Sequence, residues 1–170
     1  EWIPGVEVIP CSATDEAIVS DVISLLRRAG KMPARVRDSP GFIANRLQFA
    51  LFREAVRCVD EGVATPEDID TVVQSTFGFR MPAFGPFAIA DMAGLDVYVN
   101  ILGTLHEGLG DQFDVPGTLQ RLVDDGHIGL KSGAGFEQYS REDAEHLVLH
   151  RARAYSALAS VMDGLASDYD

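Results

Sequence analysis

The sequence has few basic residues and few cysteines. Its 170 residues contain 14 Lys and Arg against 26 Asp and Glu, which gives a formal net charge of −12. This acidity excludes the basic surface with which proteins bind nucleic acid, and it argues equally against an anionic membrane surface. Two cysteines, Cys11 and Cys58, are too few for a disulfide scaffold, so we interpret both as reduced packing residues.

Long apolar runs are also missing. No run approaches the roughly 20 residues that a membrane-spanning helix needs, and the first ten residues lack the basic start and apolar stretch of a secretory signal. Hydrophobic residues make up 46% of the chain and charged residues 24%, which favours a packed core over disorder. The sequence therefore predicts an acidic, cytoplasmic, globular protein that binds neither nucleic acid nor membrane.

Complete catalytic signatures are absent as well. The chain has no G-x-S-x-G elbow, no P-loop and no G-x-G-x-x-G fingerprint. Its four histidines are scattered, and only His146 and His150 share a helical face, at i and i+4. Such a pair on a charged helix is most often solvated, so we predict no metal site. Read from the residues alone, the chain holds no self-sufficient catalytic constellation.

The charge is distributed unevenly. Residues 1–37 contain five acidic and five basic side chains, whereas residues 38–170 hold the remaining 21 acidic and nine basic ones and so carry the whole −12. Such an asymmetry indicates a domain boundary near Asp38. We therefore predict one domain over residues 1–38 and a second over residues 39–170.

The first segment is typical of a strand, a helix and a second strand. The strands are expected over residues 6–9 and 34–37, and Ser12 or Thr14 is expected to cap the helix between them. This order is typical of a parallel sheet, but one such unit cannot cover both faces of a sheet. We interpret the segment as the end of a larger α/β domain.

The rest of the chain has helical periodicity. A Gly-rich connector, G-L-K-S-G-A-G-F-E-Q-Y-S, interrupts it before the last helix. The expected fold class is mainly α: a helical bundle preceded by a strand–helix–strand remnant. Helices are predicted from Pro40 to Gly62, from Thr65 to Gly78, from Pro86 to Gly94, and over residues 95–109, 116–125 and 141–165.

Three residues are candidates for a functional site. Glu7, in the middle of the first strand, is either a solvent-facing carboxylate or a group that orients a neighbouring imidazole and stabilises its cationic form. Asn45 is either an exposed polar residue or a hydrogen-bonding partner of a substrate or catalytic side chain. Lys131 is either a surface lysine or a partner for a ligand's phosphate or hydroxyl.

The stretch D-S-P-G-F-I-A-N-R-L at 38–47 resembles the start of the helical domain in the L-3-hydroxyacyl-CoA dehydrogenase family. Upstream, V-E-V-I at 6–9 is similar to the last-but-one strand of that family's cofactor domain, and the resemblance covers residues 2–140. Three further blocks follow in the family's order: D-E-G-V-A-T-P-E-D-I-D at 60–70, G-P-F-A-I-A-D-M-A-G-L-D at 85–96 and K-S-G-A-G-F at 131–136.

The resemblance implies an NAD-dependent oxidation of a secondary alcohol to a ketone, in fatty acid metabolism. It implies that Glu7 is the carboxylate paired with the catalytic His, that Asn45 lies near the substrate and that His, and that Lys131 reaches the nicotinamide cofactor. Residues 1–38 would be the end of a Rossmann-type domain, and residues 39–170 a substrate domain that also forms a homodimer. The catalytic His, a substrate-binding Ser and the Gly-rich unit would lie upstream of Glu1, so the segment alone is expected to be inactive.

Two departures leave the substrate open. Ala88 stands where many family members have Glu, and the chain continues into a long final helix over 141–165. Relatives in the superfamily act on carnitine, gulonate or pyridine carbinol acids instead of an acyl-CoA. The five basic residues within 27–37 are either contacts for ligand phosphates or, preferably, a solvated helix end and edge strand. A non-catalytic helical dimerisation module is the alternative from another functional class.

Overall fold

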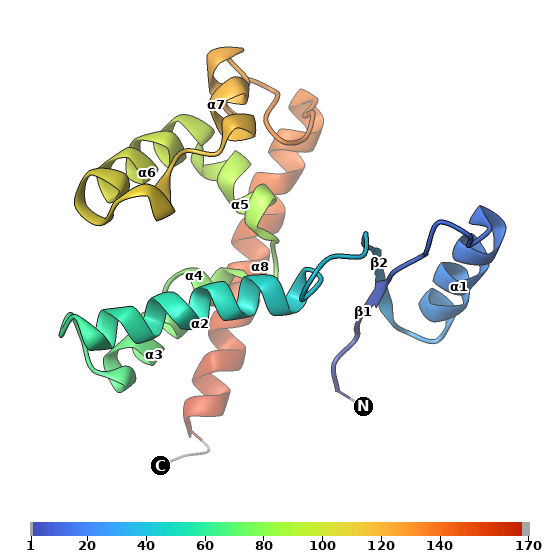
Figure 1. The fold of residues 1–170 in the computed structure, drawn as a ribbon, viewed down its shortest axis with the longest axis horizontal. Helices are drawn as coiled ribbons and strands as arrows, with labels where there is room; N and C mark the ends of the chain where they lie inside the picture. Colours follow the sequence, from blue (N-terminus) through green and yellow to red (C-terminus); the bar gives the residue numbers. More distant parts are fainter. Residues whose placement is uncertain (1, 168–170) are drawn as a thin grey trace. The chain divides into compact units, whose positions relative to one another are not determined.

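The computed structural model describes residues 2–167, which divide between Asp70 and Thr71 into two compact units (Figure 1). Helices dominate both units, and the described residues contain one sheet, of two parallel strands. The predicted fold class, mainly α with a short strand–helix–strand segment at the start, is confirmed. The domain boundary predicted between residues 38 and 39 stays a prediction.

The first unit begins with β1 (Gly5–Val8), α1 (Glu16–Arg28) and β2 (Met32–Arg35). The strands pair in parallel with Glu7 opposite Ala34, and β2 begins two residues earlier than predicted. The predicted cap of α1 is wrong. Asp15 is the N-cap, and its carboxylate accepts from the Ala17 N–H at 2.8 Å. Thr14 lies instead in a turn before the helix, where its N–H donates to the Cys11 carbonyl at 3.0 Å and its Oγ1 accepts from the Cys11 N–H at 3.1 Å.

Helix α2 (Ala44–Asp60) starts four residues later than the predicted start at Pro40. Gly41 and Phe42 have φ of +77° and +49°, and the Phe42 N–H closes a turn on the Ser39 carbonyl at 2.9 Å. Left-handed residues cannot belong to a right-handed helix, so the turn delays the helix. Phe42 is the one non-glycine residue with positive φ among residues 2–167.

The start of α3 (Pro66–Ser75) is as predicted, but its end is not. The Thr65 Oγ1 accepts from the Asp68 N–H at 3.1 Å and donates to the Asp68 carboxylate at 2.6 Å, which caps the helix. The helix ends at Ser75 because Thr76 leaves the helical region, with φ −112° and ψ −104°. Gly78, the predicted end, lies inside the short helix α4 (Phe77–Arg80).

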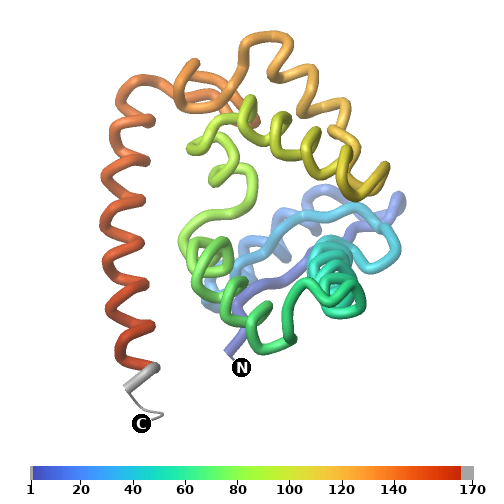
Figure 2. Tube along the Cα trace, turned by 90° about the vertical axis from the view of Figure 1, so that its left-hand side faces the viewer, coloured from blue at the N-terminus to red at the C-terminus, as the bar shows by residue number. Residues whose placement is uncertain are grey.

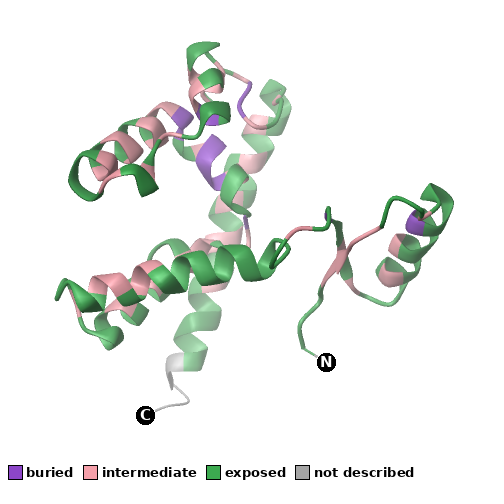
Figure 3. Ribbon diagram, viewed as in Figure 1, coloured by how far each residue is buried: buried purple, intermediate pink, exposed green. Residues whose placement is uncertain are grey.

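The second unit contains the predicted helices α5 (Pro86–Ala93), α6 (Leu95–Leu109), α7 (Gly117–Asp124) and α8 (Arg141–Ser167). A 3₁₀ turn, η1 (Asp111–Phe113), follows α6. The core forms where Ala90, Leu95 and Leu119 pack together (Figure 3). These residues come from α5, α6 and α7, so this helical core supports the loop that follows α7.

Helix α8 follows that loop as one long element (Figure 2). Aromatic rings hold it to the segment before α5. Tyr155 packs edge-on against Phe79 and Phe84, with ring centroids 5.8 and 6.0 Å apart, and His150 packs against Phe84 at 5.5 Å. Within the described residues no single helix is long and apolar enough to cross a membrane, and α5 with α6 meets that measure only as a pair bent by 101°.

Candidate functional site

Glu7 forms hydrogen bonds with the start of α2. Its Oε1 accepts from the N–H groups of Ile43 at 2.8 Å and Ala44 at 3.3 Å. No side chain of α2 itself caps this end, so the strand carboxylate satisfies free helix N–H groups and places a negative charge at the positive end of the helix dipole. The Glu7 Oε2 accepts no hydrogen bond from any residue that the structure describes.

Asn45 lies in the first turn of α2 and is exposed. Glu7 is bound to the N–H of the residue just before it, so the fold brings two of the three candidate residues to one helix end. The left-handed Phe42 lies immediately before this end. Backbone strain of that kind persists where the surrounding structure enforces it, and such positions cluster at functional sites.

Lys131 belongs to the second unit and lies in the Gly-rich loop between α7 and α8. Its Nζ is 3.7 Å from Asp96 Oδ1, and the two side chains are 54% and 42% exposed. An exposed ion pair of this length contributes little free energy, so Lys131 can exchange Asp96 for another anion at small cost. Its exposed ammonium is thus compatible with both interpretations of Lys131, a surface lysine or the cofactor contact that the family resemblance implies.

Sequence reasoning missed Asp91, which is completely buried in α5. Its carboxylate accepts from the N–H groups of Phe136 at 3.0 Å and Glu137 at 3.1 Å, and from the Tyr139 hydroxyl at 2.8 Å. Burial raises the pKa of Tyr139, and the hydrogen bond to Asp91 raises it further. The phenol therefore stays protonated and donates. The sequence signal that could have identified Asp91 is its position as the one acidic residue within the apolar run A-I-A-D-M-A.

Arg35, one of the five basic residues considered for ligand phosphates, is paired inside its own unit. Both of its terminal nitrogens donate to the Glu16 carboxylate, at 2.7 and 2.6 Å. This bidentate contact holds the pKa of Glu16 below its usual value. The contact favours the interpretation of Arg35 as part of a solvated edge strand, paired with α1, over a contact to ligand phosphates.

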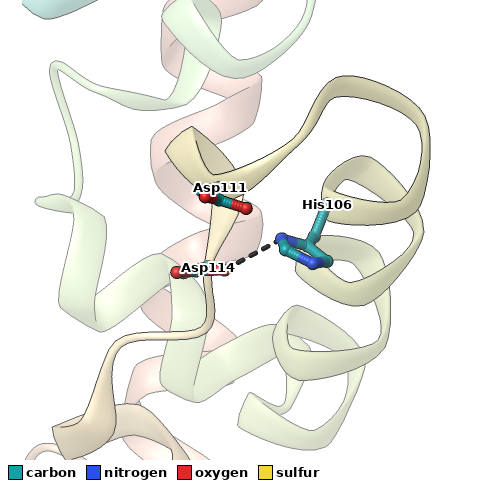
Figure 4. A group of neighbouring side chains, drawn as sticks. All are labelled: His106, Asp111 and Asp114. Carbon is teal, nitrogen blue, oxygen red and sulfur yellow. Dashed lines mark ion pairs between the residues drawn. The ribbon is translucent and has the colours of Figure 1, made fainter.

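One group of side chains has metal-ligand chemistry. His106, Asp111 and Asp114 each offer a ligand atom within 4.8 Å of the others (Figure 4). His106 Nδ1 and Asp114 Oδ1 are 2.8 Å apart, in side chains that are 43% and 68% exposed. A surface contact between an imidazole and a carboxylate accounts for this proximity, and we assign no metal to it.

The family model for the 3-hydroxyacyl-CoA dehydrogenase C-terminal domain matches residues 41–139. A probable 3-hydroxybutyryl-CoA dehydrogenase of Bacillus subtilis is 44% identical over 138 residues, which are 81% of this chain and 47% of the relative. The chain spans about half the length of the curated relatives it matches.

Two solved structures share the fold. The 3-hydroxyacyl-CoA dehydrogenase of Archaeoglobus fulgidus is 31% identical, with a TM-score of 0.76 over 93% of this chain and 55% of its own. The 5-formyl-3-hydroxy-2-methylpyridine 4-carboxylic acid 5-dehydrogenase, described as an NAD⁺-dependent dismutase, is 37% identical. Its TM-score is 0.60 over 95% of this chain and 53% of its own. Similarity thus extends past the family model into α8. The chain belongs to the 3-hydroxyacyl-CoA dehydrogenase family and contains its C-terminal domain.

Proposed function

We propose that the chain is the C-terminal part of an NAD-dependent cytoplasmic dehydrogenase that oxidises a secondary alcohol to a ketone. The observation that carries this proposal is the position of Glu7, whose Oε1 is held by the start of α2 while Oε2 has no partner among the described residues. A carboxylate fixed in this way can accept from an imidazole N–H with its second oxygen. It would then hold the imidazole in one tautomer and stabilise its cationic form.

The other two candidate residues have complementary roles in this proposal. Asn45, exposed one residue beyond the N–H that binds Glu7, can donate to or accept from a substrate oxygen or the imidazole. Lys131 offers its ammonium to an anionic or hydroxyl group of the cofactor after leaving Asp96. When bound, NAD accepts the hydride. The chain's own residues orient the base, the substrate and the cofactor.

The substrate class divides into two candidates, because the relatives include a hydroxybutyryl-CoA dehydrogenase and a pyridine carboxylate dehydrogenase. We propose a 3-hydroxyacyl-CoA or related hydroxy acid. The gene's full-length protein should reduce NAD with 3-hydroxybutyryl-CoA, and residues 1–170 alone should not.

The measurement is NADH formation by both proteins, with a pyridine carbinol acid as the second substrate. Turnover of the pyridine compound alone would replace the CoA proposal. Turnover by residues 1–170 alone would contradict the proposal that the catalytic base lies outside these residues. Failure of the full-length protein with both would favour the non-catalytic module.

The surface of α2 supports a further part of the proposal, a homodimer through the helical domain. No residue of α2 is buried, and Leu47, Phe49 and Phe52 are about 60% exposed (Figure 3). Exposed large apolar side chains on one helix are typical of an interaction surface, and we propose that a second copy of the chain covers it. Sedimentation of the full-length protein should give twice the mass of one chain. A monomer at micromolar concentration would remove this part of the proposal.

A further inference from the structure

We propose that Asp91 is a positioning residue for Lys131: it holds the Gly-rich loop so that the lysine ammonium is presented to an anionic group of the dinucleotide. The inference rests on the proposed function, in which Lys131 contacts the cofactor. It assigns a task to the A-D-M-A-G-L-D segment at 90–96, which the roles of Glu7, Asn45 and Lys131 leave unexplained.

Asp91 holds the loop on both sides of Lys131. Its backbone carbonyl accepts from the Leu130 N–H at 3.0 Å, directly before the lysine. Its carboxylate accepts from the Phe136 and Glu137 N–H groups and from the Tyr139 hydroxyl, after the lysine. A fully buried carboxylate is costly unless its oxygens are hydrogen-bonded, and here three donors from one loop meet that need. The loop conformation and the buried charge therefore depend on each other.

Two glycines of the loop, together with Gly94 between α5 and α6, make this approach possible. A Cβ at Gly135 would overlap the Asp91 carboxylate, and a Cβ at Gly129 would overlap the Asp91 carbonyl. A Cβ at Gly94 would lie 2.8 Å from the Lys131 Nζ and 2.6 Å from the Asp96 Oδ1. The overlaps at Gly129 and Gly135 involve the Asp91 backbone and its buried carboxylate, whereas those at Gly94 involve the ends of two exposed side chains, which can shift at small cost. The segment at 90–96 therefore holds the loop through Asp91 and admits the lysine beside Gly94, where Asp96 is its weak partner.

The consequence for binding is preorganisation. A lysine on a free loop loses conformational entropy when it binds an anion, whereas a lysine on a fixed loop has lost it already. The loop on both sides of Lys131 is bonded to Asp91, through Leu130 before it and Phe136 after it, while its ammonium is only loosely held by Asp96. Such a lysine can exchange Asp96 for the anionic group of the dinucleotide while its position in the loop stays fixed.

The experiment uses the full-length protein and five variants: D91N, Y139F, K131A and the double variants D91N/K131A and Y139F/K131A. One readout is the dissociation constant of NAD, measured by calorimetry without substrate. The other is amide hydrogen exchange at Phe136 and Glu137 in the cofactor-free protein. The matched control is D125N, which removes the same charge from an exposed position at the end of α7.

K131A should weaken NAD binding by roughly 10- to 100-fold, the range for a hydrogen bond to a charged group. D91N should speed exchange at both amides and weaken NAD binding to a similar degree, and D91N/K131A should be no weaker than K131A. Y139F, which removes one donor and keeps the carboxylate, should weaken NAD binding several-fold only when Lys131 is present. D125N should match the wild type in both readouts.

The outcomes separate this inference from the function beneath it. If K131A binds NAD as tightly as the wild type, Lys131 has no cofactor role and this inference loses its basis. The dehydrogenase proposal would stand, because Glu7 variants and turnover test it separately. A weakened K131A together with wild-type binding in D91N and Y139F would overturn the inference alone. So would additive losses in the double variant. If D91N does not fold, Y139F measured with and without Lys131 decides the question.

Discussion

Replacing Glu7 with glutamine in the full-length protein is expected to lower kcat by roughly 10²- to 10⁴-fold, the range over which general acid–base groups and their partners act. The glutamine carbonyl oxygen can still accept from the Ile43 and Ala44 N–H groups, so the start of α2 keeps its cap. What is lost is the negative charge, and with it the stabilisation of an imidazolium. NAD affinity should stay close to the wild-type value, and the protein should lose only the roughly 0.3–1 kcal/mol that a negative charge contributes at the helix N-terminus.

The control for E7Q is E7A, which removes the cap as well as the charge. It should lower kcat similarly and also destabilise the protein by about 0.5–2 kcal/mol, the cost of losing a helix cap. E16Q, at the exposed ion pair with Arg35, should change neither quantity appreciably. A wild-type kcat in E7Q would remove Glu7 from the mechanism. Equal loss of stability in E7Q and E7A would contradict the proposed exchange of carboxylate for amide at the cap.

The second large effect is expected at Gly129. The residue is buried, its φ is +97°, and a Cβ there would overlap the Asp91 carbonyl. An alanine meets two penalties: about 1–2 kcal/mol for the left-handed backbone and about 1–3 kcal/mol for forced overpacking. G129A should therefore lose about 2–5 kcal/mol of unfolding free energy in urea titration.

Gly126 offers a matched control for G129A. Its φ is +77°, and no atom lies within 4 Å of a Cβ built there, so an alanine meets the backbone penalty alone. G126A should lose about 1–2 kcal/mol. If G129A is as stable as G126A, the loop moves away from Asp91 without cost, and the close packing described above does not hold the loop.

Where an element is specified by neighbouring residues, the sequence predicts it correctly. Thr65, Pro66 and Asp68 define the start of α3 within four positions, and Pro86 and Gly94 bracket α5. The errors arise where a local competitor decides. Asp15 caps α1 because Thr14 is part of a turn with Cys11 that precedes the helix, and α2 starts at Ala44 because Gly41 and Phe42 are left-handed. Backbone conformation of that kind has no reliable signature in residue type, least of all for phenylalanine.

The candidate site divides in the same way. The identities of Glu7, Asn45 and Lys131 follow from motif resemblance, but their neighbours do not. The Glu7 carboxylate meets the Ile43 N–H 36 residues along the chain, and Asp91 meets the Tyr139 hydroxyl 48 residues along. Periodicity and spacing describe contacts within an element, whereas these bonds join elements whose approach depends on packing.

By itself the sequence determined the family, the mainly helical class, most helix starts, and the acidic balance that is concentrated after Asp38. Those properties are local or additive, so they can be read residue by residue. Only the tertiary structure decided that Glu7 caps the helix that carries Asn45, and that a buried Asp91 holds the loop that carries Lys131. Both results depend on burial and on hydrogen bonds between distant segments, and these exist only once the chain has folded.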